Sequence, residues 1–193
     1  MGRKVSPCGQ ASIAVRLARP ADYPAILQLQ AQNVPENLSD AQKRQGFIVS
    51  RMDEAQLAHI NQRLGILVAT AAERLAGFVC LMSTDARPRP PVVDAMLATL
   101  AGLSFNGAPL SEQRVFMYGP VCLDRAWRGK GVLKQLYAAV RAHTCGEFDA
   151  GALFIDDDNP HSLAAHVQGL GMTALAPFRS GQKDYQLVVF ATR

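Results

Sequence analysis

The segment Arg128-Gly129-Lys130-Gly131 carries the clearest chemical signal in this sequence. Its two glycines let the backbone turn tightly and expose consecutive N–H groups. Apolar residues at helical spacing follow, so a helix is expected to begin here with its positive end at the turn. Lys134 adds a further charge. These features favour binding of a pyrophosphate, although a plain glycine turn with solvated basic residues is the alternative.

The overall charge supports a local anion site better than a broad basic surface. The chain has 193 residues, 49% of them apolar and 19% charged, with a formal net charge of +4. Five basic residues and no acid lie between Arg125 and Arg141. Nucleic-acid binders normally combine a wide basic face with aromatic or base-edge contacts, and only Trp127 and Tyr137 lie close. We therefore expect no nucleic-acid partner.

Other classes are disfavoured by what the sequence lacks. Its apolar runs are far shorter than the ~20 residues that span a bilayer, and no apolar segment follows the basic residues near the start. The four cysteines are widely separated and show no metal-ligand spacing. We expect free thiols, no metal site, no membrane partner and a cytoplasmic protein.

Strands and helices alternate along most of the chain. Residues 1–12 are expected to be a disordered extension, and 13–193 a single domain with an insertion at about 84–113. Strands are predicted at Ile13–Leu17, Ile66–Ala71, Leu75–Met82, Val115–Leu123, Ala152–Ile155, Met172–Phe178 and Tyr185–Phe190. Helices are predicted from Ala21, over Asp53–Arg63 and Val92–Leu103, after Gly131, and from Pro160 to about Gln168. Because Pro120 cannot donate to a sheet ladder, the strand that contains it must be at an edge, splayed or bulged.

Two common nucleotide motifs do not fit this pattern. A P-loop needs Ser or Thr after Gly-Lys and a glycine five positions earlier, where Gly131 and Asp124 stand. A Rossmann fingerprint needs three glycines near the first strand, but only two are present, two-thirds of the way along the chain.

The residues instead resemble the GNAT superfamily of N-acetyltransferases. Residues 121–133, Val-Cys-Leu-Asp-Arg-Ala-Trp-Arg-Gly-Lys-Gly-Val-Leu, are similar to its acetyl-CoA motif, a strand that runs into Arg/Gln-x-x-Gly-x-Gly/Ala. Leu133 departs from the small residue usual at the last position. Downstream, the segments 159–166 and 170–172 resemble the family's Asn-x-x-Ala/Ser helix and its Leu-Gly-Phe end.

This resemblance implies an α/β fold with a mixed, mostly antiparallel sheet that is splayed at its fourth strand and covered by helices on both faces. It also implies acetyl-CoA as cosubstrate. A pantetheine arm would pair with the strand edge, and the pyrophosphate would lie on the amides of the glycine turn. The implied cofactor-binding residues are Val121, Cys122, Leu123, Arg128, Gly129, Lys130, Gly131, Val132, Leu133, Asn159 and Ser162.

Catalytic and acceptor-binding residues are less well defined by the sequence. His166 stands where many family members have a tyrosine that protonates the departing thiolate, and a histidine can do so. A packed helix histidine is the alternative. Tyr118 is a candidate proton relay or a core residue. Glu36, with Asn37 and Phe47, is a candidate for binding the acceptor amine, or an exposed loop acid.

The resemblance implies an enzyme that moves an acetyl group to a primary amine by direct attack in a ternary complex. The acceptor would be a small molecule or a peptide, and a homodimer is compatible with such a fold. A catalytically weak acyl-CoA sensor or interaction module of the same fold is the alternative, because Leu133 departs from the motif and no base is assigned.

Overall fold

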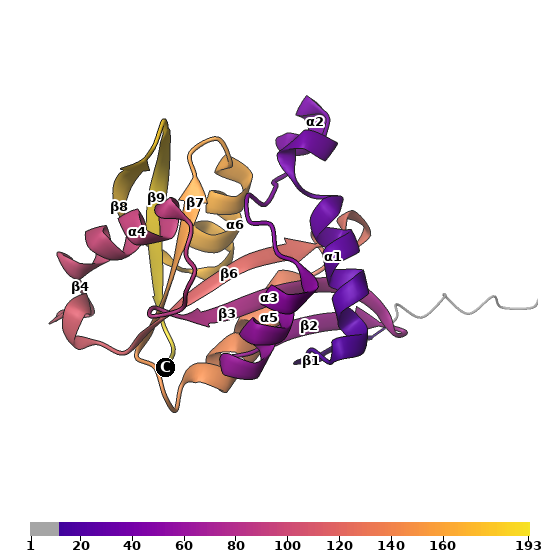
Figure 1. The fold of residues 1–193 in the computed structure, drawn as a ribbon, viewed down its shortest axis with the longest axis horizontal. Helices are drawn as coiled ribbons and strands as arrows, with labels where there is room; N and C mark the ends of the chain where they lie inside the picture. The colour runs from indigo at the N-terminus through magenta and orange to yellow at the C-terminus, as the bar shows by residue number, and fades with distance from the viewer. Residues whose placement is uncertain (1–11) are drawn as a thin grey trace, which may run out of the picture.

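The computed structural model describes residues 12–193, so nearly all of the expected N-terminal extension lies outside the described residues (Figure 1). The helices are α1 (Tyr23–Ala31), α2 (Asp40–Lys43), α3 (Glu54–Arg63), α4 (Pro91–Ala101), α5 (Val132–Thr144) and α6 (Pro160–Leu170). The strands are β1 (Ile13–Leu17), β2 (Ile66–Ala71), β3 (Arg74–Ser83), β4 (Ser104–Phe105), β5 (Ala108–Pro109), β6 (Val115–Leu123), β7 (Ala150–Asp156), β8 (Thr173–Ser180) and β9 (Lys183–Ala191).

Seven strands form one sheet in the order β1-β2-β3-β6-β7-β9-β8. Every neighbouring pair is antiparallel except β6 and β7, which are parallel. Parallel neighbours need a crossover, and α5 supplies it. The predicted mixed, mostly antiparallel α/β fold is therefore confirmed.

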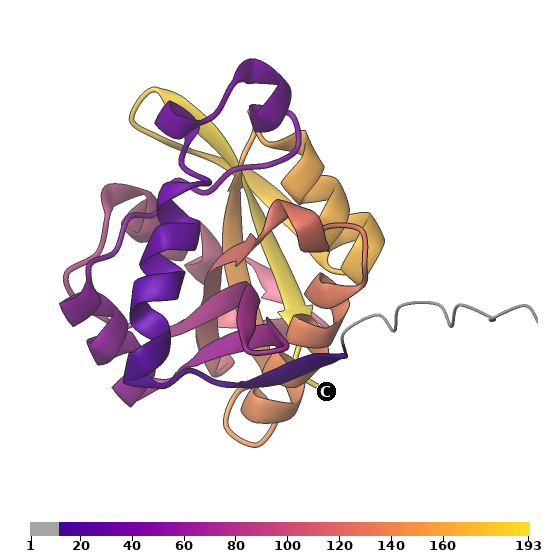
Figure 2. The same ribbon diagram turned by 90° about the vertical axis from the view of Figure 1, so that its right-hand side faces the viewer.

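Helices cover both faces of this sheet (Figure 2). On one face, α1 and α3 pack over β2 and β3 around Ile26, Leu57 and Phe78, all fully buried. Further along the same face, α4 packs against β8 and β7. On the other face, α5 and α6 enclose a second core that contains Leu136 and Phe116. The expected elements form because their apolar residues repeat with the period that one buried face requires.

The break in β6 comes at Gly119 and Pro120. The pairing of β6 with β3 shifts register there, and Gly119 has a φ of 114°, a value that favours glycine. On the other side, β6 pairs with β7 only from Val115 to Met117. The strand is therefore both bulged against β3 and splayed from β7, rather than at an edge of the sheet.

The structure adds two short elements that the sequence pattern did not predict, the helix α2 and the pair of strands β4 and β5. Ser39 begins the short helix α2 with a capping box, since its hydroxyl accepts from the N–H of Gln42 and the Gln42 side chain accepts from the N–H of Ser39. Within residues 84–113, the expected insertion, α4 confirms the helix predicted over Val92–Leu103, and β4 and β5 form a small hairpin that turns at Asn106 and Gly107. The helix α2 and this hairpin are too short to show a hydrophobic period.

Candidate functional site

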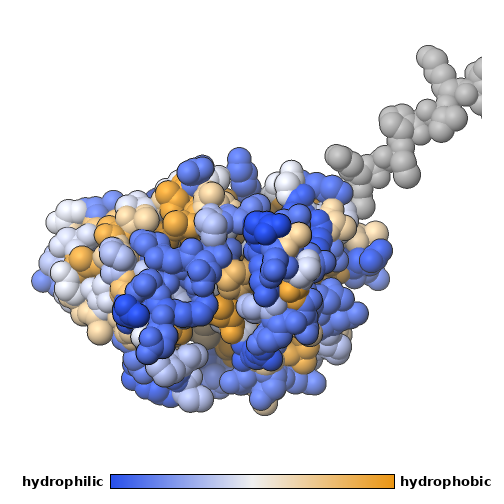
Figure 3. Space-filling view, turned by 90° about the horizontal axis from the view of Figure 1, so that it is seen from above, coloured by the Kyte–Doolittle hydropathy of each residue, from blue (hydrophilic) through white to orange (hydrophobic). Residues whose placement is uncertain are grey.

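Two clefts meet where β6 leaves β7. The α5–α6 cleft has a volume of about 510 Å³ and is lined by Asn33 and by some of the residues in each of the segments 45–48, 121–123, 128–134 and 161–170. The α3–α4 cleft, of about 520 Å³, lies on the other side of the splay between α3, the 86–90 loop and the start of α4. Phe47, Ile48, Val121 and Ser162 line both. Viewed from above, apolar residues lie in the hollow between polar flanks (Figure 3).

The start of α5 forms one wall of the α5–α6 cleft. Gly129 and Gly131 have φ values of 71° and 79°, and an added Cβ on either would meet nothing within 4 Å. The glycines are thus required by backbone conformation, and they leave open space above the turn. The first intrahelical bond runs from the N–H of Gln135 to the carbonyl of Gly131, so the preceding amides have no helical acceptor. Free N–H groups and the helix dipole make this end suited to an anion.

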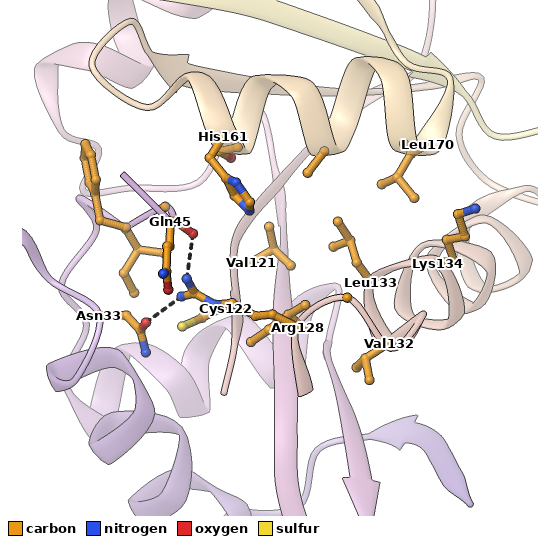
Figure 4. Close-up of a pocket in the computed structure, with 18 of the residues that line it drawn as sticks. Asn33, Gln45, Val121, Cys122, Arg128, Val132, Leu133, Lys134, His161 and Leu170 are labelled. Atoms are coloured by element: carbon orange, nitrogen blue, oxygen red, sulfur yellow. Dashed lines mark hydrogen bonds between the residues drawn. The ribbon is translucent and has the colours of Figure 1, made fainter. Parts of the chain in front are cut away.

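Arg128 does not point at this turn. Its guanidinium donates to the carbonyl of Gln45 at 2.6 Å and to Oδ1 of Asn33 at 2.8 Å (Figure 4). Half-burial lowers its pKa, yet an arginine stays charged at any ordinary pH. The side chain therefore fastens the loop after α1 to the glycine turn. Figure 4 shows Lys134 on the opposite side of the cleft from Arg128, and this lysine also lines the cleft.

The splayed edge of β6 forms the floor between the clefts. The N–H of Asp124 donates to the carbonyl of Ala76 in β3. Backbone groups two residues apart in a strand point the same way, so Cys122 also faces β3, whereas Val121 and Leu123 direct their N–H and C=O groups to the open side. Since β7 does not pair beyond Met117, those groups are available to an extended ligand.

The opposite wall begins with Asn159, which caps α6. Its Oδ1 accepts from the N–H of Ser162 at 3.2 Å, and its Nδ2 donates to the carbonyl of Phe47 at 2.9 Å. Because Asn159 is only 5% exposed and makes both bonds, it joins the 45–48 segment to α6. It lines the α3–α4 cleft, and Lys130 lines neither cleft. The other nine residues expected to bind the cofactor all line the α5–α6 cleft.

Tyr118 and His166, the expected catalytic residues, lie together in the core. Their rings contact edge to face with centroids 5.8 Å apart, and both side chains are at most 3% exposed. Among the described residues, neither the Tyr118 hydroxyl nor His166 Nε2 has a hydrogen-bond partner. Tyr118 lines the α3–α4 cleft, but His166 lines neither cleft.

The protonation of this pair follows from its surroundings. His166 Nδ1 lies 2.8 Å from the carbonyl of Ser162, an acceptor, so Nδ1 carries the proton and Nε2 keeps a lone pair. Burial lowers the pKa of His166, against that hydrogen bond, and burial raises the pKa of Tyr118. Both groups are therefore neutral near pH 7, one a donor and one an acceptor.

Of the expected acceptor-binding residues, Phe47 is at the site and the other two are beside it. Phe47 lines both clefts. Glu36 forms an ion pair with Arg51, and Asn37 donates to the carbonyl of Ala31. Neither Glu36 nor Asn37 lines either cleft, so in this structure they brace the loop that follows α1.

Sequence reasoning missed most of the α3–α4 cleft. One side is the face of α3 that carries Gln56, His59 and Arg63, and the other is the segment from Ala86 to Val93. These residues form no motif because the fold brings them together from separate elements. The sequence held one signal for this cleft. Arg63 comes three residues after the buried Ile60, so helical spacing places the arginine near the buried face of α3.

Two basic residues outside both clefts, Lys130 and Arg141, pack against aromatic rings. Lys130 lies over the Trp127 ring at 5.2 Å, and Arg141 stacks over Tyr137 at the far end of α5. Within residues 12–193, Cys80, Cys122 and Cys145 are free, and burial raises the pKa of Cys122 to about 12.

Across residues 12–193, no group of three or more His, Cys, Asp or Glu side chains is placed for a metal. Nor does any helix there have the length and apolarity needed to cross a membrane.

Solved structures with the same arrangement include N-acetyltransferases. An N-acetyltransferase from Staphylococcus aureus Mu50 aligns with a TM-score of 0.61 at 15% identity, over 94% of this chain and 99% of its own. The ribosomal-protein-S18-alanine N-acetyltransferase of Escherichia coli aligns with a TM-score of 0.59 at 10% identity, over 94% of each chain. Salmonella typhimurium yncA, solved with its cofactor acetyl-CoA, aligns with a TM-score of 0.54 at 18% identity, over 94% of each chain.

These likenesses over nearly the whole chain show the fold. This chain has the GNAT N-acetyltransferase fold, and the resemblance inferred from its two sequence motifs is confirmed at that level. No family model and no curated protein sequence matches the chain.

Proposed function

We propose that this chain is an acetyl-CoA-dependent N-acetyltransferase that moves an acetyl group to a primary amine by direct attack in a ternary complex. The observation that carries the proposal is the meeting of two clefts at an unpaired strand edge, with a helix N-terminus at the entrance of one of them. One cleft suits a phosphate-bearing cofactor, and the other leaves room for an acceptor on the opposite side.

The residues of the α5–α6 cleft fit acetyl-CoA. The amides at the start of α5, with Lys134, would hold its pyrophosphate. Val121 and Leu123 would pair with the pantetheine arm as an added strand does, and the acetyl thioester would then lie at the splay. When bound, the cofactor supplies an activated acetyl group. The N–H of Val121, which points to the open side, would stabilise negative charge on the acetyl oxygen.

Tyr118 is the proposed proton donor to the departing thiolate. It lines the acceptor side next to the break in β6, and its raised pKa keeps the phenol protonated. His166 is proposed as a positioning residue behind it, because its ring packs edge to face against the Tyr118 ring and holds the phenol in place without taking its proton. The pair supplies one donor and one acceptor without burying a charge.

Acetyl-CoA turnover tests the proposal directly. Purified protein is incubated with acetyl-CoA and a panel of amines, and release of free thiol is followed. Acceptor-dependent thiol release well above hydrolysis supports the proposal. A Gly77→Asp variant, in which an added Cβ would meet Leu123 at 2.4 Å, should lose activity through distortion of β6.

The second candidate is an acyl-CoA sensor of the same fold. The sealed positions of the Tyr118 hydroxyl and His166 Nε2 favour it, because in this state neither atom is open to solvent. Tight CoA binding, measured by Trp127 fluorescence or calorimetry, with no thiol release across the amine panel would replace the enzyme proposal with this one.

A further inference from the structure

The α3–α4 cleft carries an excess of arginine. Four arginines line it, Arg51, Arg63, Arg87 and Arg89, against the carboxylates of Asp53 and Asp156, with His59 also present. Asp53 is already engaged, because its side chain accepts from the N–H of Gln56 at the start of α3. The cleft is therefore positive in spite of its place on the proposed acceptor side.

Two of these arginines are held by acids outside the cleft, and two are not. Arg51 pairs with Glu36, and Arg89 pairs with Asp94 at 2.6 Å while bonding the carbonyl of Thr84. Within residues 12–193, neither Arg63 nor Arg87 has a carboxylate within ion-pair distance. Arg87 donates to the backbone carbonyls of Asp85 and Ala86 through Nη1 alone. Both guanidiniums therefore have donors left for a ligand, since each presents five N–H groups.

Arg63 and Arg87 face the same region from different elements. Arg63 is the last residue of α3, and Arg87 lies in the loop after β3. The pKa of Asp85 is lowered mainly by a hydrogen bond from Ser83, and the charges of both arginines contribute to the same lowering. Asp85 itself is exposed and does not line the cleft, whereas both arginines do.

The two ends of the cleft differ in charge, with the two arginines at one end and Asp156 at the other. Ser83, beside the arginines, pairs with Phe116 at the start of β6, whereas Asp156 is at the far end of β7. The splay at Gly119 lies three residues beyond Phe116, or about 10 Å at the rise of a strand. Between these points the lining is apolar and includes Met82, Met96 and Met117.

We propose that the acceptor is a small amphipathic amine: a primary amine joined through an apolar spacer to an anionic group, carboxylate or phosphate, that Arg63 and Arg87 bind. This inference rests on the proposed function, and it specifies the substrate class of the same site. The amine reaches the splay, the spacer covers the methionine-lined floor, and the anion meets the two guanidiniums, which suit either oxyanion geometrically.

Matched acceptors test the inference. Thiol release is measured with hexylamine, 6-aminohexanoate and 6-aminohexyl phosphate, which share an unbranched six-carbon chain and differ in the group at its far end. The kcat/KM for an anionic acceptor should exceed that for hexylamine by roughly tenfold or more, as expected for charge-assisted hydrogen bonds. The better of the two anionic acceptors identifies whether a carboxylate or a phosphate is preferred.

Variants locate the effect. Arg63→Gln and Arg87→Gln should each reduce the preference for the anionic acceptor by roughly tenfold. Arg74→Gln, which removes the same charge from the exposed start of β3 and outside both clefts, should keep the preference. Equal or better use of hexylamine, or a preference that Arg63→Gln and Arg87→Gln leave intact, overturns the inference.

Binding measurements separate this inference from the proposed function. If no amine supports thiol release, calorimetry with 6-aminohexanoate and 6-aminohexyl phosphate still reports on the arginines. Saturable binding that Arg63→Gln and Arg87→Gln weaken, and Arg74→Gln does not, would uphold the anion site while the transferase proposal fails. Absence of binding by both compounds to the unmodified protein would overturn the anion site as well.

Discussion

The guanidinium of Arg128 donates to Oδ1 of Asn33 at 2.8 Å, and the two residues are 95 positions apart in the sequence. This contact fastens the loop after α1 to the glycine turn before α5. Asn33 is only 2% exposed, so its amide oxygen depends on this partner. The arginine of the motif thus supports the cleft from the side, and the backbone amides next to it remain open.

Replacing Arg128 with Ala should therefore destabilise the protein. The loss removes two charge-assisted bonds and leaves a buried oxygen unpaired, which costs about 1–3 kcal/mol. Denaturant unfolding measures this change. Arg125→Ala is the matched control, because Arg125 is exposed and makes one long bond of 3.4 Å to Gln32, so it should change stability by less than about 0.5 kcal/mol. If both substitutions lowered the free energy of unfolding equally, the bonds of Arg128 to Gln45 and Asn33 would not stabilise the fold.

Gly131→Asn should weaken CoA binding more than it weakens the fold. Asn tolerates the left-handed conformation better than most residues, so the strain should be about 1 kcal/mol or less. Its side chain would extend into the space above the turn and reduce affinity by roughly tenfold or more. Trp127 fluorescence or calorimetry measures the affinity.

Gly181→Asn is the control for that substitution. Gly181 also has a positive φ, of 60°, with nothing near an added Cβ, and it lies in the β8–β9 turn outside both clefts. It should keep full affinity. If Gly131→Asn binds CoA as tightly as Gly181→Asn does, the cofactor is not held at the start of α5.

Tyr118→Phe should be neutral or stabilising while it reduces turnover. The hydroxyl is buried without a partner among the described residues. Burying a polar group without a hydrogen bond costs about 1–2 kcal/mol of stability, and the substitution removes that cost. If the phenol protonates the thiolate, kcat should fall by roughly 100-fold or more while the KM for acetyl-CoA changes little. Thermal unfolding and steady-state kinetics on one preparation test both parts. A variant with unaltered kcat would remove Tyr118 from the reaction.

His166 should make the protein less stable in mild acid. Burial lowers its folded pKa, so below about pH 6.5 the unfolded chain takes up a proton that the folded protein resists. Stability should then fall by up to about 1.4 kcal/mol per pH unit until the folded pKa is reached, and no contribution is expected above about pH 7.5. His166→Gln should flatten this dependence between pH 5 and 7. Parallel pH profiles for the two proteins would show that the imidazole is not desolvated.

The same histidine shows how far a motif can predict a role. Its position in the Asn159 segment was readable from spacing, and the helix that carries it forms as expected. The direction of its ring was not readable, because that depends on which face of α6 packs against the sheet. The structure buries the ring beside Tyr118 and leaves Ser162, one turn earlier, at the junction of the clefts.

The α3–α4 cleft marks the other limit. Arg63 and Arg87 are 24 residues apart and belong to a helix end and an irregular loop, neither of which carries a motif. Their shared orientation depends on the packing of α3 over β3 and on the path of the chain into α4. Local patterns cannot encode such a relationship, since each element only specifies its own buried face.

By itself the sequence determined the period of each main element, the interruption at Gly119-Pro120 and the glycine turn before α5, because these depend on the backbone preferences of neighbouring residues. The GNAT fold was implied only by the resemblance of two of its segments to that superfamily. Only the tertiary structure decided that Arg128 binds Asn33, that Tyr118 and His166 meet in the core, and that arginines from separate elements line one cleft. Side-chain partners distant in the chain are set by how faces pack, and packing is a property of the whole fold.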